Sequence, residues 1–338
     1  MRLEAPFWWY RERGALASAL APLGRLFGRL AERRAARVTP YRSRLPVICI
    51  GNLTAGGGGK TPTALAVAAL LGEFGARACF LTRGYGGTSE GPLLVRKEHS
   101  ASEVGDEPLL LAEAAPTIVS ADRVAGAKAI EATEASVIVM DDGFQNPSLV
   151  KDLSLIVVDA GVGLGNELIM PAGPLRAPLD AQLGRADALV VIGSGDKAAS
   201  LADAFKAQSK PVFTARIVSR QDSRWLRVLP VIGFAGIANP QKFFATLGTN
   251  GAGLEEKRAF PDHYRYTNRE AAALLKLAKD RKAMLVTTEK DWVRLPDEEG
   301  TPLGELKFRS RPFAIAVQFD DAAGVKELLA ATIAKATA

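Results

Sequence analysis

The chain has 338 residues, of which 48% are apolar and 24% are charged, as in ordinary soluble globular proteins. This composition excludes a disordered chain, a fibre and a polytopic membrane protein, and the length predicts two domains. The two cysteines, Cys49 and Cys79, both lie in apolar runs. A disulfide framework and a Cys-rich zinc site are therefore excluded, and a reducing, cytoplasmic setting is expected.

The net charge of +6 is concentrated at the N-terminal end of the sequence. Residues 1–44 contain ten Arg, no Lys and three Glu, a net charge of +7, so the remaining residues sum to −1. A nucleic-acid-binding protein carries a basic face on its folded body. We therefore expect no nucleic-acid partner.

Residues 1–45 are predicted to form an amphipathic segment at a membrane interface. Aromatic residues fill positions 7–10, and such rings favour the lipid–water boundary. Apolar residues then recur at spacings of 4, 3, 4 and 3, which predicts a helix with a narrow apolar stripe. Pro22 is expected to interrupt this helix or to begin a second one. The stripe comprises Leu16, Leu20, Leu23, Phe27 and Leu30.

Neither a transmembrane helix nor a signal peptide is expected in this segment. Its longest uncharged stretch, residues 14–24, has 11 residues, whereas a spanning helix needs about 20. The flanking charges and the short apolar stretch do not fit a signal peptide. Two interpretations stay open: the helix lies on an anionic bilayer, where each Arg contributes about 1 kcal/mol, or it packs on the protein's own body.

From residue 46 onward, short apolar runs alternate with helical stretches, which is typical of a parallel sheet covered on both faces. We predict an α/β fold with a P-loop NTPase-like parallel sheet domain over residues 46–213. A short ribbon-like connector near residues 216–227 leads into a second, smaller α/β domain over residues 214–338. Its predicted strands are Val231–Phe234, Met284–Thr287 and Phe313–Val317.

The strongest chemical signal is a glycine-rich turn between the first strand and a helix, with the sequence GNLTAGGGGKT at residues 51–61. Glycines let backbone amides converge on phosphate oxygens, and the helix N-terminus favours anions. The arrangement is that of a phosphate-binding loop, in which Lys60 contacts the β- and γ-phosphates and Thr61 binds Mg²⁺. Thr54 stands where such loops usually carry their first glycine.

A second signal is an apolar run at 137–140 that ends in Asp141 and Asp142. Phosphate-loop enzymes place their metal-binding Asp at the end of such a strand. The two carboxylates are therefore predicted to take part in a magnesium site.

Further polar residues follow other predicted strands, where open parallel sheets bind their ligands. They are Arg83 and Tyr85 in LTRGYG, Asp106 in VGDEP, and Arg123 in ADR. His263, in FPDHY, belongs to the second domain and can act only if the two domains meet. Each of these residues alone is more often a cap, a turn or a structural side chain.

Taken together, these residues resemble the tetraacyldisaccharide 4′-kinase (lipid A 4′-kinase) family. The resemblance runs along most of the chain, and Thr54 is itself part of this family's loop. It rests on the ordered motifs GNLTAGGGGKTP, LTRGYG, VGDEP, ADR, DDGFQ, PAGPLR, GIANPQKFF, FPDHY and TTEKDWVR. The sequence departs from many members at Ala177, where they carry Glu.

The resemblance implies an ATP- and Mg²⁺-dependent kinase. It would transfer the γ-phosphoryl group to the 4′-hydroxyl of an acylated disaccharide 1-phosphate. The implied location is peripheral, at the cytoplasmic face of the bacterial inner membrane, so an anionic membrane surface is a second expected partner.

The resemblance also implies roles for individual residues. Asp106 matches the general base, His263 the imidazole paired with it, and Lys60 the phosphate-binding lysine. The matched basic and aromatic residues for phosphate or sugar contacts are Arg83, Tyr85, Arg123 and Arg176. The metal ligands would be Thr61, Asp141 and Asp142. The nucleotide loop would comprise Thr54, Ala55, Gly56, Gly57, Gly58, Gly59, Lys60 and Thr61.

Two other functions are compatible with a phosphate loop beside an amphipathic helix. One is a membrane-associated partition-type ATPase, but such proteins place a Lys where this chain has Ala55. The other is a nucleotide-dependent regulatory switch without enzymatic transfer. ADP release that depends on an acylated sugar distinguishes a kinase from both.

Overall fold

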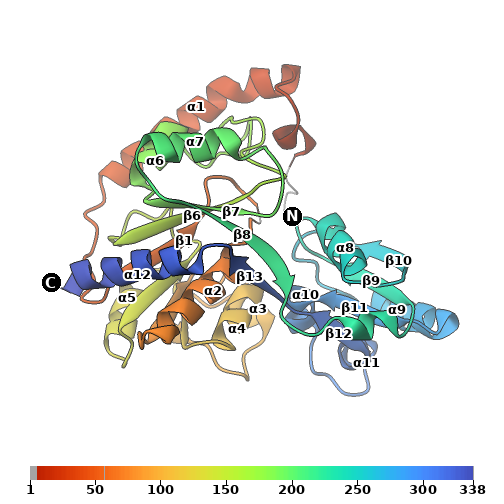
Figure 1. Cartoon of the computed structure of the whole chain (residues 1–338). Helices are drawn as coiled ribbons and strands as arrows, with labels where there is room; N and C mark the ends of the chain where they lie inside the picture. The colour runs from red at the N-terminus through yellow and green to blue at the C-terminus, as the bar shows by residue number, and fades with distance from the viewer. Residues whose placement is uncertain (1–5, 57, 338) are drawn as a thin grey trace.

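The computed structural model describes residues 6–56 and 58–337, and within these residues two sheets are present (Figure 1). We call the nine-stranded sheet with its helices the large unit, and the four-stranded sheet with its helices the small unit. The predicted position Gly57 lies outside the described residues. The two-unit α/β architecture agrees with the fold class predicted from the sequence.

The sheet of the large unit has the strand order β13-β8-β7-β6-β1-β5-β2-β4-β3. Its central strands are parallel, whereas β3 and β13 at the two edges pair antiparallel with β4 and β8. The strands are β1 (Val47–Gly51), β2 (Ala78–Thr82), β3 (Leu93–Leu94), β4 (Thr117–Val119), β5 (Val137–Asp141), β6 (Leu153–Asp159), β7 (Ala188–Ile192), β8 (Val212–Ser219) and β13 (Ile315–Phe319).

Both faces of this sheet are covered, which explains why its strands are apolar without alternation. In β1, Val47 and Cys49 enter the core on one face, while Ile48 and Ile50 enter the core on the other. The first face packs against α5 (Arg123–Glu131), α6 (Leu179–Arg185) and α7 (Ala199–Ala207). The second packs against α2 (Lys60–Glu73), α4 (Asp106–Ala112) and α12 (Ala322–Thr337).

The small unit is built around a parallel sheet with the strand order β10-β9-β11-β12. These strands are β9 (Val231–Ala235), β10 (Leu254–Ala259), β11 (Met284–Thr288) and β12 (Ser310–Phe313). One face carries α8 (Pro240–Thr249), and the other carries α9 (Asn268–Arg281) and α11 (Pro302–Arg309). The short helices are η1 (Phe7–Tyr10), α3 (Ala101–Val104), η2 (Arg224–Arg227) and α10 (Glu289–Arg294).

The connection between the units differs in two respects from the predicted boundaries. The predicted strand 313–317 is split at Ala314, because β12 pairs with β11 in the small unit and β13 pairs with β8 in the large unit. Strand pairing also places residues 212–219 and 315–319 in the large sheet, whereas the sequence assigned 214–338 to the smaller domain. An antiparallel ribbon, β8 with β13, thus joins the units.

The N-terminal helix α1 (Ala15–Ala36) lies on the large unit through its small residues. Its buried positions are Ala17, Gly24 and Gly28, and the two glycines approach Ile169. The predicted apolar stripe instead faces largely outward. Leu16, Leu23, Phe27 and Leu30 are between 44% and 54% exposed, and Leu26 adds a further exposed leucine. None of the described helices is long and apolar enough to span a bilayer.

The expectation that Pro22 interrupts this helix is wrong, because α1 continues through it. A proline in a helix interior removes one backbone hydrogen bond, to the carbonyl four residues earlier. Pro22 and Ser18 are both exposed, so water can hydrate the Ser18 carbonyl that is left without a backbone donor.

A methyl group added at Gly24 is expected to loosen α1 from the large unit. The new Cβ atom would lie 2.5 Å from the carbonyl oxygen of Ile169, a rigid backbone atom. Overpacking of this kind costs about 1–3 kcal/mol. We expect faster hydrogen exchange and proteolysis of residues 15–36 in Gly24→Ala. Gly14→Ala is the matched control, because, its chain neighbours aside, no atom of residues 6–56 or 58–337 lies within 4 Å of its Cβ position. Equal protection of both variants would contradict this packing.

Candidate active site

The phosphate loop connects β1 to α2 through glycines in left-handed conformations. Gly56 has φ +114° and Gly59, the residue before α2, has φ +84°. A Cβ atom at Gly59 would also lie 2.8 Å from Cδ1 of Ile192. These positions therefore require glycine. The side chain of Lys60 turns back over the loop, where its Nζ donates to the Gly56 carbonyl oxygen at 3.3 Å.

A second segment, around Pro174 to Arg176, holds the loop from outside. Ala55 N donates to the Pro174 carbonyl oxygen at 2.7 Å, and Arg176 Nε donates to the Thr54 carbonyl oxygen at 3.1 Å. The same guanidinium lies 3.4 Å from the Asp142 carboxylate. Arg176, predicted to contact substrate, thus lies between the loop and the carboxylates at the end of β5.

The N-terminal aromatic segment also contacts this loop. Tyr10 Oη donates to the Ala55 carbonyl oxygen at 3.3 Å, and Trp9 Nε1 donates to the Pro171 carbonyl oxygen at 3.0 Å. Trp9 is buried, whereas Phe7 is 66% exposed. The predicted interfacial segment is therefore in direct contact with the predicted nucleotide loop.

Asp141 is buried beside the start of α2, with one of its oxygens unpaired. The Thr61 hydroxyl donates to Asp141 Oδ2 at 2.9 Å, whereas the buried Oδ1 has no hydrogen-bond partner among the described residues. Burial, with the nearby charges of Glu107 and Asp142, raises the pKa of Asp141 to about 7. A bound cation would satisfy this oxygen and favour the ionised carboxylate.

Asp142 faces the same space from a left-handed backbone position, with φ +54°. Burial alone would raise its pKa, but the charges of Lys60 and Arg176 outweigh burial and hold the pKa of Asp142 below its usual range. Within residues 6–56 and 58–337, no three His, Cys, Asp or Glu side chains are grouped to hold a metal. A magnesium ion needs no such cage, since it binds one or two carboxylates together with phosphate oxygens and water.

The other predicted basic and aromatic residues line the same edge of the large sheet. Arg83 follows β2 and is exposed. Arg123 begins α5 and is buried, and its guanidinium donates to the Ser120 carbonyl oxygen while its Nε has no partner among the described residues. Burial, together with the charge of Arg83, lowers the pKa of Arg123. The Tyr85 ring packs edge-on against His263, with centroids 5.2 Å apart.

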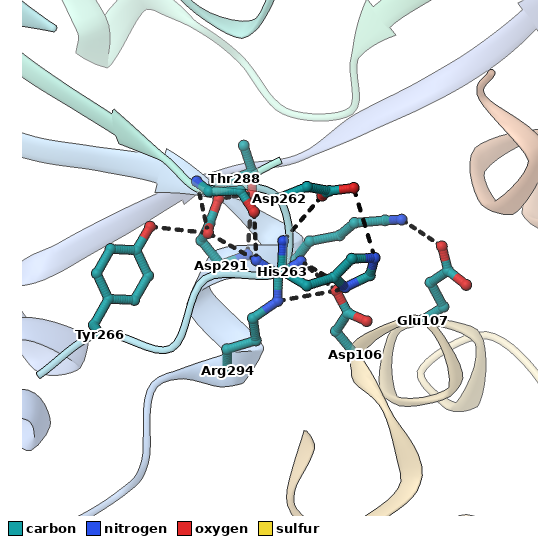
Figure 2. Close-up of polar contacts among 10 residues, drawn as sticks. Asp106, Glu107, Asp262, His263, Tyr266, Thr288, Asp291 and Arg294 are labelled. Atoms are coloured by element: carbon teal, nitrogen blue, oxygen red, sulfur yellow. Dashed lines mark hydrogen bonds and ion pairs between the residues drawn. The ribbon is translucent and has the colours of Figure 1, made fainter. Parts of the chain in front are cut away.

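Asp106 and His263 meet where the two units contact each other (Figure 2). Asp106 is the first residue of α4 and is 3% exposed, and its Oδ2 lies 3.3 Å from His263 Nδ1. Burial would raise the pKa of Asp106, but the hydrogen bond from His263 and the charges of Arg294 and Lys290 hold it well below its usual range. The pairing that the resemblance implied is therefore geometrically present.

Three residues of α10, in the TTEKDWVR motif, complete this cluster, and no individual role was predicted for any of them. Arg294 donates to Asp106 Oδ2 through Nε at 3.0 Å and through a second guanidinium nitrogen. Lys290 Nζ donates to Glu107 Oε1 at 2.6 Å, and Asp291 accepts from Arg294 at 3.0 Å. The only available signal was the motif itself, because residues 106 and 294 are far apart along the chain.

A cleft of about 400 Å³ opens beside this cluster, between the two units. Tyr85 and Asp106 line it from the large unit, and His263, Arg265 and Arg294 line it from the small unit. Glu107, the neighbour of Asp106, lies near enough to Asp141 to raise its pKa. The cluster is thus within electrostatic reach of Asp141, which accepts a hydrogen bond from Thr61 at the end of the phosphate loop.

Known proteins resemble this chain along nearly its whole length. A family model described as tetraacyldisaccharide-1-P 4′-kinase matches residues 16–334. A protein of Methylobacterium sp. (strain 4-46), named tetraacyldisaccharide 4′-kinase, is 51% identical over 334 residues, which cover 98% of each chain. A protein of the same name from Nitrobacter winogradskyi is 45% identical over 335 residues, again 98% of each chain.

A solved structure shares the fold along nearly the whole chain. The "apo" form of LpxK from Aquifex aeolicus, crystallised in complex with ATP, matches with a TM-score of 0.72 and 27% sequence identity. The match covers 94% of this chain and 99% of that one. These findings favour the predicted kinase over a partition-type ATPase. The chain belongs to the tetraacyldisaccharide-1-P 4′-kinase family.

Proposed function

We propose that this chain transfers the γ-phosphoryl group of ATP to the 4′-hydroxyl of a tetraacyldisaccharide 1-phosphate. The observation that carries the proposal is the Asp106–His263 pair in a cleft, with the neighbouring Glu107 within electrostatic reach of Asp141. In the transfer, the acceptor oxygen bonds to the γ-phosphorus, the bond to the β,γ-bridging oxygen breaks, and ADP leaves. The acceptor proton passes to Asp106.

The phosphate loop would bind the triphosphate. Phosphoryl transfer relies mainly on positioning and on neutralising charge. Lys60, held over the loop, supplies one positive charge. Arg123 supplies another from a buried position, with an Nε that has no partner in the described part of the chain. Arg83 and Tyr85, at the same edge of the large sheet, are suited to contact the sugar or its phosphate.

Thr61, Asp141 and Asp142 would hold magnesium. Their oxygen atoms suit a hard cation, and the buried Asp141 Oδ1, which has no hydrogen-bond partner among the residues described, is the atom that fits such a ligand best. When bound, the ion neutralises charge on the phosphate oxygens during transfer. Ala177, where many family members carry Glu, offers only a methyl group, and its carbonyl oxygen accepts a hydrogen bond from Gln182 Nε2 at 2.8 Å.

The outer face of α1, together with Phe7, would rest on an anionic membrane surface. Its apolar side chains are exposed, while the helix contacts the large unit through its small residues. Arg25, Arg29 and Arg33 on the same helix are exposed and can meet lipid phosphates. We place the protein at the cytoplasmic face of the inner membrane, because its lipid acceptor is held there by its acyl chains.

Charges placed on this outer face are expected to weaken membrane binding. In Leu23→Glu/Phe27→Glu, partitioning onto vesicles that contain anionic lipid should fall at least about tenfold, because two apolar side chains no longer enter the interface. Phe308→Glu is the matched control, since Phe308 is 90% exposed on α11 of the small unit. Sedimentation with liposomes measures both. Unchanged partitioning of the double variant would mean that this face does not enter the bilayer.

The proposed reaction is tested by the dependence of ATP consumption on the acceptor. ADP release is measured with magnesium, with and without an acylated disaccharide 1-phosphate in detergent micelles. We expect release only in the presence of the acceptor. Equal release in its absence would favour a simple ATPase and would contradict the proposal.

A further inference from the structure

The guanidinium of Arg294 joins the two units at Asp106. Its side chain is 8% exposed and makes two hydrogen bonds to a single carboxylate oxygen of Asp106, Oδ2. His263 Nδ1 approaches the same oxygen at 3.3 Å. No described residue donates a hydrogen bond to the other oxygen, Oδ1, and Asp106 lines the cleft. Within the described residues, Oδ2 of Asp106 thus accepts hydrogen bonds from Arg294, whereas Oδ1 accepts none.

Arg294 also donates a hydrogen bond to Asp291, whose side chain has no exposed surface (Figure 2). Asp291 Oδ1 accepts from Arg294 at 3.0 Å, from the Tyr266 hydroxyl at 2.9 Å and from Gly236 N at 2.9 Å. Its Oδ2 accepts from the Thr288 hydroxyl at 2.6 Å. A buried carboxylate with four donors is a rigid anchor for the guanidinium.

Arg294 and His263 both donate a hydrogen bond to one backbone carbonyl oxygen, that of Gly236. The Gly236 oxygen accepts from Arg294 at 2.7 Å and from His263 N at 3.0 Å. Gly236 cannot carry a side chain here, because a Cβ atom would lie 2.9 Å from Cβ of Tyr264 and 3.0 Å from Asp291 Oδ1. The small unit thus presents the guanidinium and the imidazole to Asp106 as one preformed arrangement.

We propose that Arg294, anchored by Asp291, is a positioning residue that fixes Oδ2 of Asp106 and so reserves Oδ1 for the acceptor hydroxyl. The inference rests on the proposed function, in which Asp106 accepts the hydroxyl proton. In phosphoryl transfer there is little covalent chemistry for the protein to do, so placement of the hydroxyl matters more than the strength of the base. A carboxylate held through one oxygen cannot turn away from the acceptor.

The experiment compares Arg294→Gln, Arg294→Lys and Asp291→Asn with the wild-type chain. Loss of charged hydrogen bonds of this kind corresponds to about a 10- to 150-fold fall in rate. We expect Arg294→Gln to lower kcat within this range without raising KM for ATP. Arg294→Lys should recover part of the loss, and Asp291→Asn should show a smaller loss. Arg309→Gln is the matched control, since among the described residues that exposed guanidinium pairs only with Glu305 on its own helix.

A pH profile separates positioning from a general loss of structure. Among the described residues, the charges that act on Asp106 are those of Lys290 and Arg294 on α10 and of His263 on the loop before α9. Glu107 on α4 pairs with Lys290, and Tyr85 and Arg265 line the same cleft. With Arg294 removed, the pKa of Asp106 rises, so the acidic limb of kcat moves to higher pH. In Arg309→Gln this limb stays in place. A kcat for Arg294→Gln that equals or exceeds the wild-type value would overturn the proposal.

An Asp106→Asn background distinguishes this inference from the proposed function itself. If Arg294 acts through Asp106, Arg294→Gln has little further effect on the residual rate of Asp106→Asn. A full additional loss would contradict the inference. If Asp106→Asn alone keeps normal turnover, the proposed base is wrong whatever Arg294 does. If Arg294→Gln does not fold, Arg294→Lys, which keeps the charge, carries the same test through its kcat and its pH profile.

Discussion

Replacement of Asp106 by asparagine is expected to lower kcat by about 10²–10⁴-fold, the usual contribution of a general base. Asparagine keeps the shape of the side chain, but its amide cannot take a proton from the acceptor hydroxyl. The affinity for ATP should stay within about twofold of the wild-type value, because Asp106 lies outside the phosphate loop. Steady-state kinetic assays measure kcat, and nucleotide titrations measure the affinity for ATP. Glu113→Gln removes the same charge at the exposed end of α4 and should have normal turnover.

The same substitution also has a pH-dependent effect on stability. The pKa of Asp106 is lowered in the folded state, so its ionisation stabilises the fold above the pKa of the unfolded chain. This contribution is lost as the pH falls through the folded-state pKa. We therefore expect Asp106→Asn to have a lower melting temperature than the wild type at pH 7, and we expect this difference to become smaller as the pH falls.

Near-normal turnover of a folded Asp106→Asn would exclude Asp106 as the base.

Replacement of Lys60 by alanine should cause the second largest loss of activity, a fall of about 10²–10³-fold in kcat. This is the usual effect of removing one preorganised hydrogen-bond donor to the charge that develops in the transition state. Lys60 Nζ lies 3.3 Å from the Gly56 carbonyl oxygen and 3.8 Å from Asp142 Oδ2, so it is already placed over the loop. Its loss removes a positive charge at the expected position of the β- and γ-phosphates. The affinity for ATP should fall as well, in contrast to Asp106→Asn.

Lys276→Ala provides the control for charge removal, because Lys276 is exposed on α9 and its only ion pair within the described part of the chain is with Asp280. Single-turnover kinetics separate nucleotide binding from the chemical step. If Lys60→Ala kept both its affinity and its rate, the loop would not hold the triphosphate, and the assignment of residues 54–61 would be wrong.

The phosphate loop could be predicted from sequence because its chemistry is local. Glycines before a Lys–Thr pair, between a buried strand and a helix, lie within eleven consecutive residues. The position of Asp141 and Asp142 could be predicted for the same reason, because both acids directly follow an apolar strand. The pairing of Asp106 with His263 came only through the family resemblance, since their separation along the chain contains no information on contact.

The other features of the site and of the fold could not be predicted from sequence, because they depend on tertiary contacts. Arg294 reaches Asp106 across 188 positions, and Asp291 accepts hydrogen bonds from Tyr266 and Gly236, which lie 25 and 55 positions away. Its bond with Thr288, the N-cap residue of α10, is local, but a helix cap alone does not indicate a contact with the other unit. The return of residues 315–319 to the large sheet is likewise set by pairing with β8.

In α1 the periodic leucines drew attention to one face. The face that packs on the large unit is instead the one with Gly24 and Gly28, whose missing side chains allow close approach. Periodicity identifies an apolar face but does not say which face of a helix the protein itself covers.

Transfer of label from γ-³²P-ATP tests the central claim most directly. The chain, magnesium and an acylated disaccharide 1-phosphate are incubated together, and the lipid and aqueous products are separated. We predict that the label appears in the lipid as a second phosphate at the 4′-position, in amounts equal to the ADP formed. Label found only as inorganic phosphate, with the lipid unchanged, would contradict the account.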